Sequence, residues 1–125
     1  MSIEIIESAI KLASSGEDEE AISLLQPLAE SGDLLAISNL GLILSYFSKN
    51  GKYTKIAEGS QLLKEACESG EGSACHNLAV LYLGNAPTLG KDLKMAAYLF
   101  LRARELRGPV ADDSFYSRWE HILNT

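Results

Sequence analysis

The sequence predicts an all-α protein, a stack of about seven helices in antiparallel pairs, from three observations. Apolar residues recur at helical spacing, a step of 38 residues relates two long segments, and glycines follow the predicted helices. The chain has 125 residues, of which 46% are hydrophobic and 22% charged, as in an ordinary globular domain. We therefore expect one helical-repeat domain over residues 1–125.

The repeat is clearest where LLQPLAESGD, beginning at Leu24, aligns without a gap with LLKEACESGE, beginning at Leu62. The same step carries Gly70 to Gly108. The matched pairs are Leu24/Leu62, Leu25/Leu63, Glu30/Glu68, Ser31/Ser69, Gly32/Gly70, Ala36/Ala74, Asn39/Asn77, Leu40/Leu78 and Gly41/Ala79. A period of this length indicates a unit that buries its apolar face by stacking on its neighbours.

The periodicity divides the chain into an N-terminal helix pair (1–32), two repeats (33–70 and 71–108) and a C-terminal capping helix (109–125). In the first pair, a helix over residues 3–14 precedes one whose apolar stripe ends at Leu28. Pro27 lies inside that second helix, and we expect it to kink the helix without breaking it, because the stripe continues past it.

In the repeats, the first helices are predicted from residue 33 to about 47 and from residue 71 to about 83. Asp33 and Ser73 are candidate caps or first-turn residues. Gly32, Gly70 and Gly108 lie where a left-handed residue would end the preceding helix. The capping helix, over residues 111–123, has Phe115, Trp119 and Ile122 on its inner stripe.

Two segments share a pattern of small residues, asparagine and leucine: Gly32-x-x-x-Ala36-x-x-Asn39-Leu40-Gly41 and Gly70-x-x-x-Ala74-x-x-Asn77-Leu78-Ala79-x-x-Tyr82. They resemble the first helix of the Sel-one-like repeat, a relative of the tetratricopeptide repeat. Its loop and second helix are matched by Leu89-x-x-Asp92-x-x-x-Ala96 and by Ala66-Cys67-x-x-Gly70. The connection over residues 46–57 departs from the family, because it lacks the expected glycine-valine-aspartate loop. The resemblance implies a short right-handed α-α superhelix whose concave wall is lined by the first helices, in a protein that binds other proteins.

Negative charge is concentrated at the start of the chain. Residues 1–38 hold eight acidic residues against one base, Lys11, whereas the chain as a whole carries −6. Such a surface repels nucleic acid and membranes and favours a basic protein partner, although acids also simply solvate small proteins. Glu17, Asp18, Glu19 and Glu20 are therefore candidate partner-binding residues; complementing the dipole of a helix N-terminus is their structural alternative.

A second candidate surface is the open side of the first helices. We expect Ser38, Leu42, Tyr46 and His76 there, with Tyr53 in the loop that follows. Tyrosines are enriched at binding hot spots, which favours Tyr46 and Tyr53 as exposed anchors.

The residues predict no catalytic, metal or cofactor site and no small-molecule substrate. Cys67 and Cys75 have no metal-ligand pattern and are interpreted as small hydrophobes packed between helices. No apolar run reaches the roughly 20 residues that span a bilayer, and the acidic start lacks the features of a secretory signal. The expected location is the cytoplasm.

These observations predict a non-catalytic module that sequesters or adapts a partner protein. In its sharpest form it is an immunity (antitoxin-like) protein that neutralises a basic bacterial toxin domain such as a nuclease. The alternative is an adaptor or chaperone-like scaffold of a secretion or signalling complex, which binds a peptide or helix in its concave groove. A cysteine-based hydrolase is the third class considered.

Overall fold

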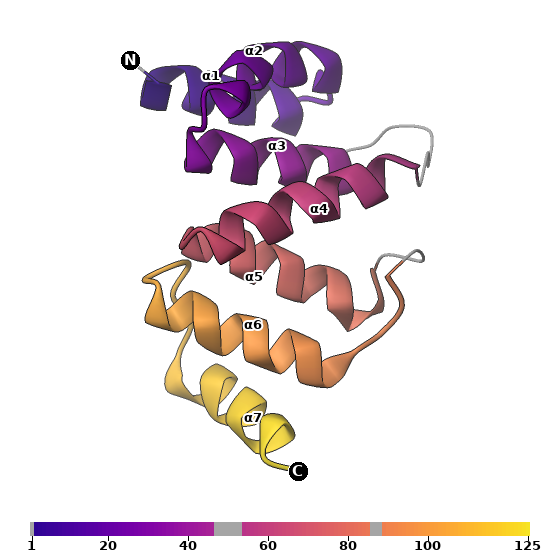
Figure 1. Cartoon of the computed structure of the whole chain (residues 1–125), viewed down its shortest axis with the longest axis vertical. Helices are drawn as coiled ribbons and strands as arrows, with labels where there is room; N and C mark the ends of the chain where they lie inside the picture. The colour runs from indigo at the N-terminus through magenta and orange to yellow at the C-terminus, as the bar shows by residue number, and fades with distance from the viewer. Residues whose placement is uncertain (1, 47–53, 86–88) are drawn as a thin grey trace.

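The computed structural model describes residues 2–46, 54–85 and 89–125, and within them the chain is helical, with no strand (Figure 1). The elements stack in chain order along the longest axis, and the two termini lie at opposite ends of the stack. This confirms the predicted all-α class. The elements are α1 (Ser2–Ser14), α2 (Asp18–Glu30), α3 (Leu34–Tyr46), α4 (Thr54–Glu68), α5 (Gly72–Val80) with the π-helical turn η2 (Leu81–Asn85), α6 (Leu93–Glu105) and α7 (Asp113–Leu123).

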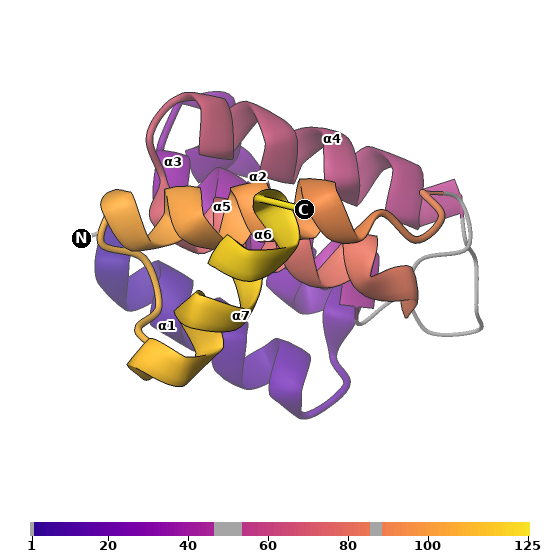
Figure 2. The same ribbon diagram turned by 90° about the horizontal axis from the view of Figure 1, so that it is seen from below.

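Each helix packs against the helix before it and the helix after it. In addition, α3 contacts both α1 and α5, so that odd-numbered helices also meet one another. In the view along the stack, α1 and α7 lie on one side and α4 on the opposite side (Figure 2). The alternation of helices leaves α2, α4 and α6 to form the walls of grooves that are described below.

The predicted helix ends at Gly32 and Gly70 are confirmed. Their φ angles are +93° and +101°, in the left-handed region that glycine adopts without a steric penalty. In both turns, the residue after the glycine donates its N–H to a carbonyl in the last helical turn: Asp33 to Leu28 at 3.1 Å and Glu71 to Ala66 at 2.9 Å. Each of these hydrogen bonds supplies a donor to a backbone carbonyl that would otherwise lack a partner at the helix end.

The prediction for Gly108 is wrong. Arg107 takes the left-handed conformation (φ +59°), and Gly108 donates its N–H to Ala103 across 2.8 Å. The reason is that α4 and α6 correspond at a step of 37 residues, one fewer than the 38-residue step of the earlier segments. Gly108 serves a close contact instead: a Cβ on it would lie 2.6 Å from the carbonyl carbon of Gly72.

At the helix starts, Asp33 caps α3 as predicted, because its Oδ1 accepts the N–H of Ala36 at 3.1 Å. The cap of α5 is Glu71, and Ser73 is the first-turn residue that donates its hydroxyl to the Glu71 carboxylate across 2.8 Å. Helix α2 runs unbroken through the exposed Pro27, as predicted, and the expected kink stays a prediction.

The buried apolar side chains form two clusters, one over α1–α3 and one over α4–α7. Between them α3 and α4 approach so closely that their backbones touch. A Cβ on Gly41 would lie 2.8 Å from the carbonyl oxygen of Gly59, and a Cβ on Gly59 would lie 2.6 Å from that of Gly41. Neither position can therefore accept a side chain unless the helices move apart.

Gly59→Ala should lower the free energy of unfolding by about 1–3 kcal/mol, even though alanine favours a helix over glycine, because the added methyl group meets backbone that cannot rotate away. Denaturant unfolding measures the difference. The matched control on the same helix is Gln61→Ala, whose exposed side chain should change stability by less than about 0.5 kcal/mol. Equal stability of Gly59→Ala and the wild type would contradict the close contact.

Candidate partner-binding surfaces

The acidic residues predicted to bind a partner lie together at the start of α2. Glu17, Glu19 and Glu20 are exposed, and Asp18 is half-buried. Glu17 occupies the N-cap position but makes no side-chain capping hydrogen bond. Both carboxylate oxygens of Asp18 are buried and lack a hydrogen-bond partner among the described residues. The acids of the first turn remain well placed to complement the helix dipole. Partner binding stays a prediction for the exposed Glu17, Glu19 and Glu20, whereas the carboxylate of Asp18 is not accessible to a partner.

The acids of α1 and α2 form no ion pair with any described cation. The ion pairs found in the described part of the chain, Arg102–Glu105 and Arg104–Glu120, both at 3.0 Å, lie on α6 and α7 at the other end of the stack. Large aliphatic side chains are exposed among the N-terminal acids: Ile3, Ile5, Ile10 and Leu24. A cavity of about 390 Å³ between Leu12 and the exposed face of α2 is lined by Glu19, Glu20, Ser23 and Leu24.

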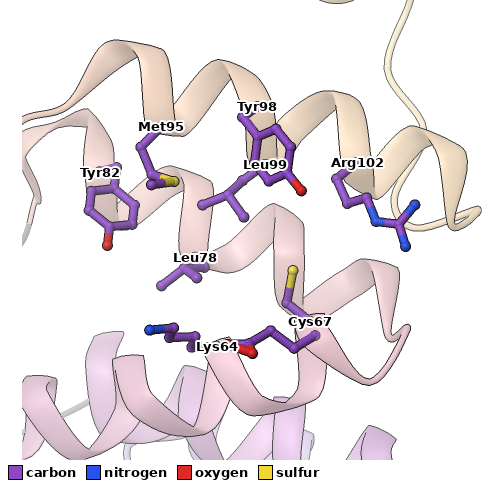
Figure 3. A pocket seen from close by; sticks show the side chains of 9 residues that line it. Lys64, Cys67, Leu78, Tyr82, Met95, Tyr98, Leu99 and Arg102 are labelled. Atoms are coloured by element: carbon purple, nitrogen blue, oxygen red, sulfur yellow. The ribbon is translucent and has the colours of Figure 1, made fainter.

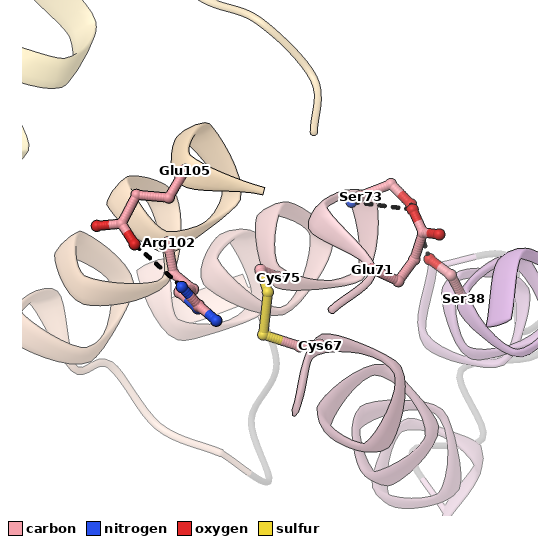
Figure 4. Close-up of a disulfide and its surroundings, with 7 residues drawn as sticks. All are labelled: Ser38, Cys67, Glu71, Ser73, Cys75, Arg102 and Glu105. Carbon is pink, nitrogen blue, oxygen red and sulfur yellow. Dashed lines mark hydrogen bonds and ion pairs between the residues drawn. A yellow bond between two sulfur atoms is a disulfide. The ribbon is translucent and has the colours of Figure 1, made fainter. Parts of the chain in front are cut away.

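Two of the candidate residues of the first helices, Ser38 and His76, contact neighbouring helices of the stack. Ser38 was expected on an open surface, but it is 1% exposed, and its hydroxyl lies 3.2 Å from that of Ser73 on α5 (Figure 4). Ser73 already donates its only hydroxyl proton to the Glu71 carboxylate, which can only accept. Ser38 is therefore the donor of the hydrogen bond that links α3 to α5.

His76 is the residue 38 positions after Ser38, and it also reaches toward neighbouring helices. It is half-buried against Phe100 and Phe115, with ring centroids 5.1 and 6.5 Å away. Burial lowers the pKa of the His76 imidazole below its ordinary value, because the charged form loses hydration. The expected open placement of Ser38 is thus wrong, and His76 is only partly exposed, because both side chains pack between helix pairs.

The remaining candidates are less completely placed. Leu42 is half-buried on α3. Tyr46 is the last residue of α3, and its side chain is outside the described structure. Tyr53 lies outside the described residues.

The interpretation of the cysteines as separate small hydrophobes is wrong. Cys67 on α4 and Cys75 on α5 form a disulfide across the turn at Gly70, with their Cα atoms 4.7 Å apart (Figure 4). The repeat has Ala29 and Ile37 at the corresponding positions. The missed signal was that the two cysteines flank a tight turn between antiparallel helices. Disulfides are rare in the cytosol, so this pair gives the expected cytoplasmic location no support.

Two corresponding grooves open between even-numbered helices. The α4–α6 groove, of about 520 Å³, has α5 as its floor (Figure 3), and the α2–α4 groove, of about 420 Å³, has α3 as its floor. In each groove we call the even-numbered helix that comes earlier in the chain the first wall and the later one the second wall. The first walls and the floors correspond at a step of 38 residues: Gln26/Lys64, Ala29/Cys67, Glu30/Glu68, Leu40/Leu78 and Leu44/Tyr82. Their second walls correspond at a step of 37 residues: Glu58/Met95, Gln61/Tyr98, Leu62/Leu99 and Glu65/Arg102.

The sequence analysis missed Met95 and Tyr98. They are 40% and 53% exposed, and Figure 3 shows them on α6 at the edge of the α4–α6 groove. The signal that could have found them was present, since their counterparts in the preceding repeat, Glu58 and Gln61, are polar. The sequence also shows that the apolar stripe of Leu93, Ala96, Phe100 and Ala103 is slipped against the 38-residue step, but this shift was not extended to Met95 and Tyr98.

Within the described residues, no group of three or more histidine, cysteine or acidic side chains is arranged to hold a metal ion. No helix of the described chain has the length and apolarity needed to cross a bilayer. Comparison with protein-family models, with curated proteins and with solved structures finds no match to this chain.

Stability should fall as the pH is lowered through the ordinary range of histidine. Because the folded pKa of His76 lies below the unfolded value, the unfolded chain binds the proton first. The contribution of His76 to the free energy of unfolding is complete above a pH of about 6.5. It is lost as the pH falls toward the lower pKa that His76 has in the folded protein. Unfolding titrations should give a shallower pH dependence for His76→Gln than for the wild type. His121→Gln, at an exposed position on α7, is the control, and equal slopes for His76→Gln and the wild type would contradict the assignment.

Reduction should destabilise the protein by up to about 2.5 kcal/mol, the loop-closure entropy expected for cysteines eight residues apart. Denaturant unfolding with and without a thiol reductant measures this difference. The double variant Cys67→Ala/Cys75→Ile, which copies Ala29 and Ile37, should be insensitive to the reductant. If the wild type is equally insensitive, the cysteines act as independent apolar side chains.

Proposed function

We propose that this chain is a non-catalytic protein-binding module whose acidic N-terminal end docks onto a basic partner. In its sharpest form it is an immunity (antitoxin-like) protein that neutralises a basic bacterial toxin domain such as a nuclease. The observation that carries the proposal is that α1 and α2 carry both acids without a described ion-pair partner and exposed aliphatic side chains.

This combination suits a protein interface better than a solvated surface. Unpaired carboxylates steer a basic partner and fix its orientation, while their effect on affinity depends on how they are desolvated. Aliphatic side chains such as Ile3 and Ile10, 53% and 43% exposed, supply apolar area for the core of an interface.

The proposed scaffold is a short superhelix of the Sel-one-like type. Its support is the resemblance of two segments to that family, the sequential packing of the helices, and the lining of two grooves by corresponding residues. The proposed location is the cytoplasm, where Cys67 and Cys75 would be kept as thiols. Alkylation of freshly lysed cells distinguishes free thiols from the disulfide.

The absence of catalysis is also a proposal. A cysteine hydrolase requires an accessible thiolate beside a base, whereas Cys75 is fully buried. His76, the adjacent residue, packs against aromatic rings. The adaptor alternative has support in the α4–α6 groove, although even-numbered helices form its walls, and not the first helices of each pair.

Reversing the acids should weaken salt-sensitive partner binding. Affinity capture with the intact protein, followed by mass spectrometry, identifies the partner, and binding is then measured over a range of salt concentrations. Glu17→Lys/Glu19→Lys/Glu20→Lys should weaken the association by about tenfold or more, because each substitution turns attraction into repulsion. Arg118→Ala, an exposed charge on α7, is the control. An acidic partner, or binding that ignores both salt and charge reversal, contradicts the proposal.

A further inference from the structure

The α2–α4 and α4–α6 grooves have the same helical framework, so their lining side chains can be compared position by position. Both are built from two even-numbered helices over an odd-numbered floor, with lining residues at matched positions. On its second wall the α2–α4 groove has Glu58, Gln61 and Glu65, so the fold requires no large apolar residue at these positions. The two grooves therefore differ in chemistry at positions where the scaffold accepts polar side chains.

The α4–α6 groove is lined by side chains typical of interfaces. Met95 and Tyr98 remain 40% and 53% exposed, and beneath them Leu78, Leu99 and Tyr82 form an apolar floor (Figure 3). Methionine adapts its shape to a bound side chain, and tyrosine supplies rigid contact area at a small entropic cost. Exposed methionine and tyrosine around an apolar floor are suited to receive a large apolar side chain.

The charges of the two grooves differ in sign. The α2–α4 groove has three carboxylates, Glu30, Glu58 and Glu65, and no lining cation. The α4–α6 groove has Lys64 and Arg102 on opposite walls against a single carboxylate, Glu68.

Both cations of the α4–α6 groove remain able to pair with a further carboxylate. Lys64 forms no ion pair with a described residue. Arg102 uses one N–H group on Glu105, at 3.0 Å, and keeps further donors in its guanidinium fork. In a chain of net charge −6, this groove is a local site for carboxylates.

We propose that the α4–α6 groove is a docking site for a segment of a second protein that presents a large apolar side chain flanked by carboxylates. The apolar side chain packs on Leu78 and Leu99 between Tyr82 and Tyr98, and the carboxylates pair with Lys64 and Arg102. This site is chemically opposite to the acidic end of the stack and does not rest on the proposed function. A module with both surfaces can hold two different partners at once.

The test is selection of a random-peptide display library on the intact protein. Enriched peptides should combine large apolar residues with aspartate or glutamate. Met95→Glu/Tyr98→Gln/Arg102→Glu, which copies the matched residues of α4, should weaken their binding by about tenfold or more. The copied residues already occupy the equivalent helix face, so we expect this variant to fold. Tyr98→Gln alone should weaken binding in the same direction and keeps the test decisive if the triple variant unfolds.

Two controls separate this site from the acidic end. Arg118→Glu removes a cation on α7 outside the groove and should leave peptide binding unchanged. Reversal of Glu17, Glu19 and Glu20 should also leave it unchanged, so the two proposals can fail independently. The groove proposal is overturned if the enriched peptides are basic, if no such motif is enriched, or if the groove variants bind like the wild type. Self-association that the triple variant abolishes would overturn it in favour of a second copy.

Discussion

The contact between the backbones of α3 and α4 at Gly41 and Gly59 is the constraint on which the rest of the stack depends. It joins the apolar cluster of α1–α3 to that of α4–α7, and Ile37 and Leu62 pack across it from either side. Since a Cβ at either glycine would meet the opposite carbonyl oxygen, the separation of these helices is fixed by main chain. This separation in turn sets the α2–α4 groove, whose second wall is α4.

Residues at matched positions keep their role in packing while their chemistry changes. Ser38 joins α3 to α5 through a hydroxyl pair, whereas His76, 38 positions later, fills the same role with an aromatic contact to Phe100 and Phe115. Side chains that connect one helix pair to the next are not free to bind a partner. This explains why the surface expected from the first helices is partly closed and why the open grooves lie between even-numbered helices.

Differences between matched positions also separate structural from functional requirements. Ala29 and Ile37 occupy the positions of the disulfide, and Glu58 and Gln61 those of Met95 and Tyr98. In each case the earlier position shows a residue type that the scaffold accepts, and the later, matched position carries a residue of different chemistry. The exposed acids of α1 and α2 and the groove with Tyr98, Lys64 and Arg102 thus give the stack two surfaces of different chemical character.

The sequence by itself determined the helical class, the helix ends at Gly32 and Gly70, the cap at Asp33 and the acidic start, because these depend on local spacing and conformation. Only the tertiary structure decided what depends on how helices meet. The slipped register of α6 is visible in the sequence, but the structure was needed to show that it places the left-handed residue at Arg107 and aligns Tyr98 with Gln61. The structure was also needed to show that the turn at Gly70 brings Cys67 to Cys75. Helical spacing tells which residues share a face; which neighbour covers that face depends on packing between distant segments.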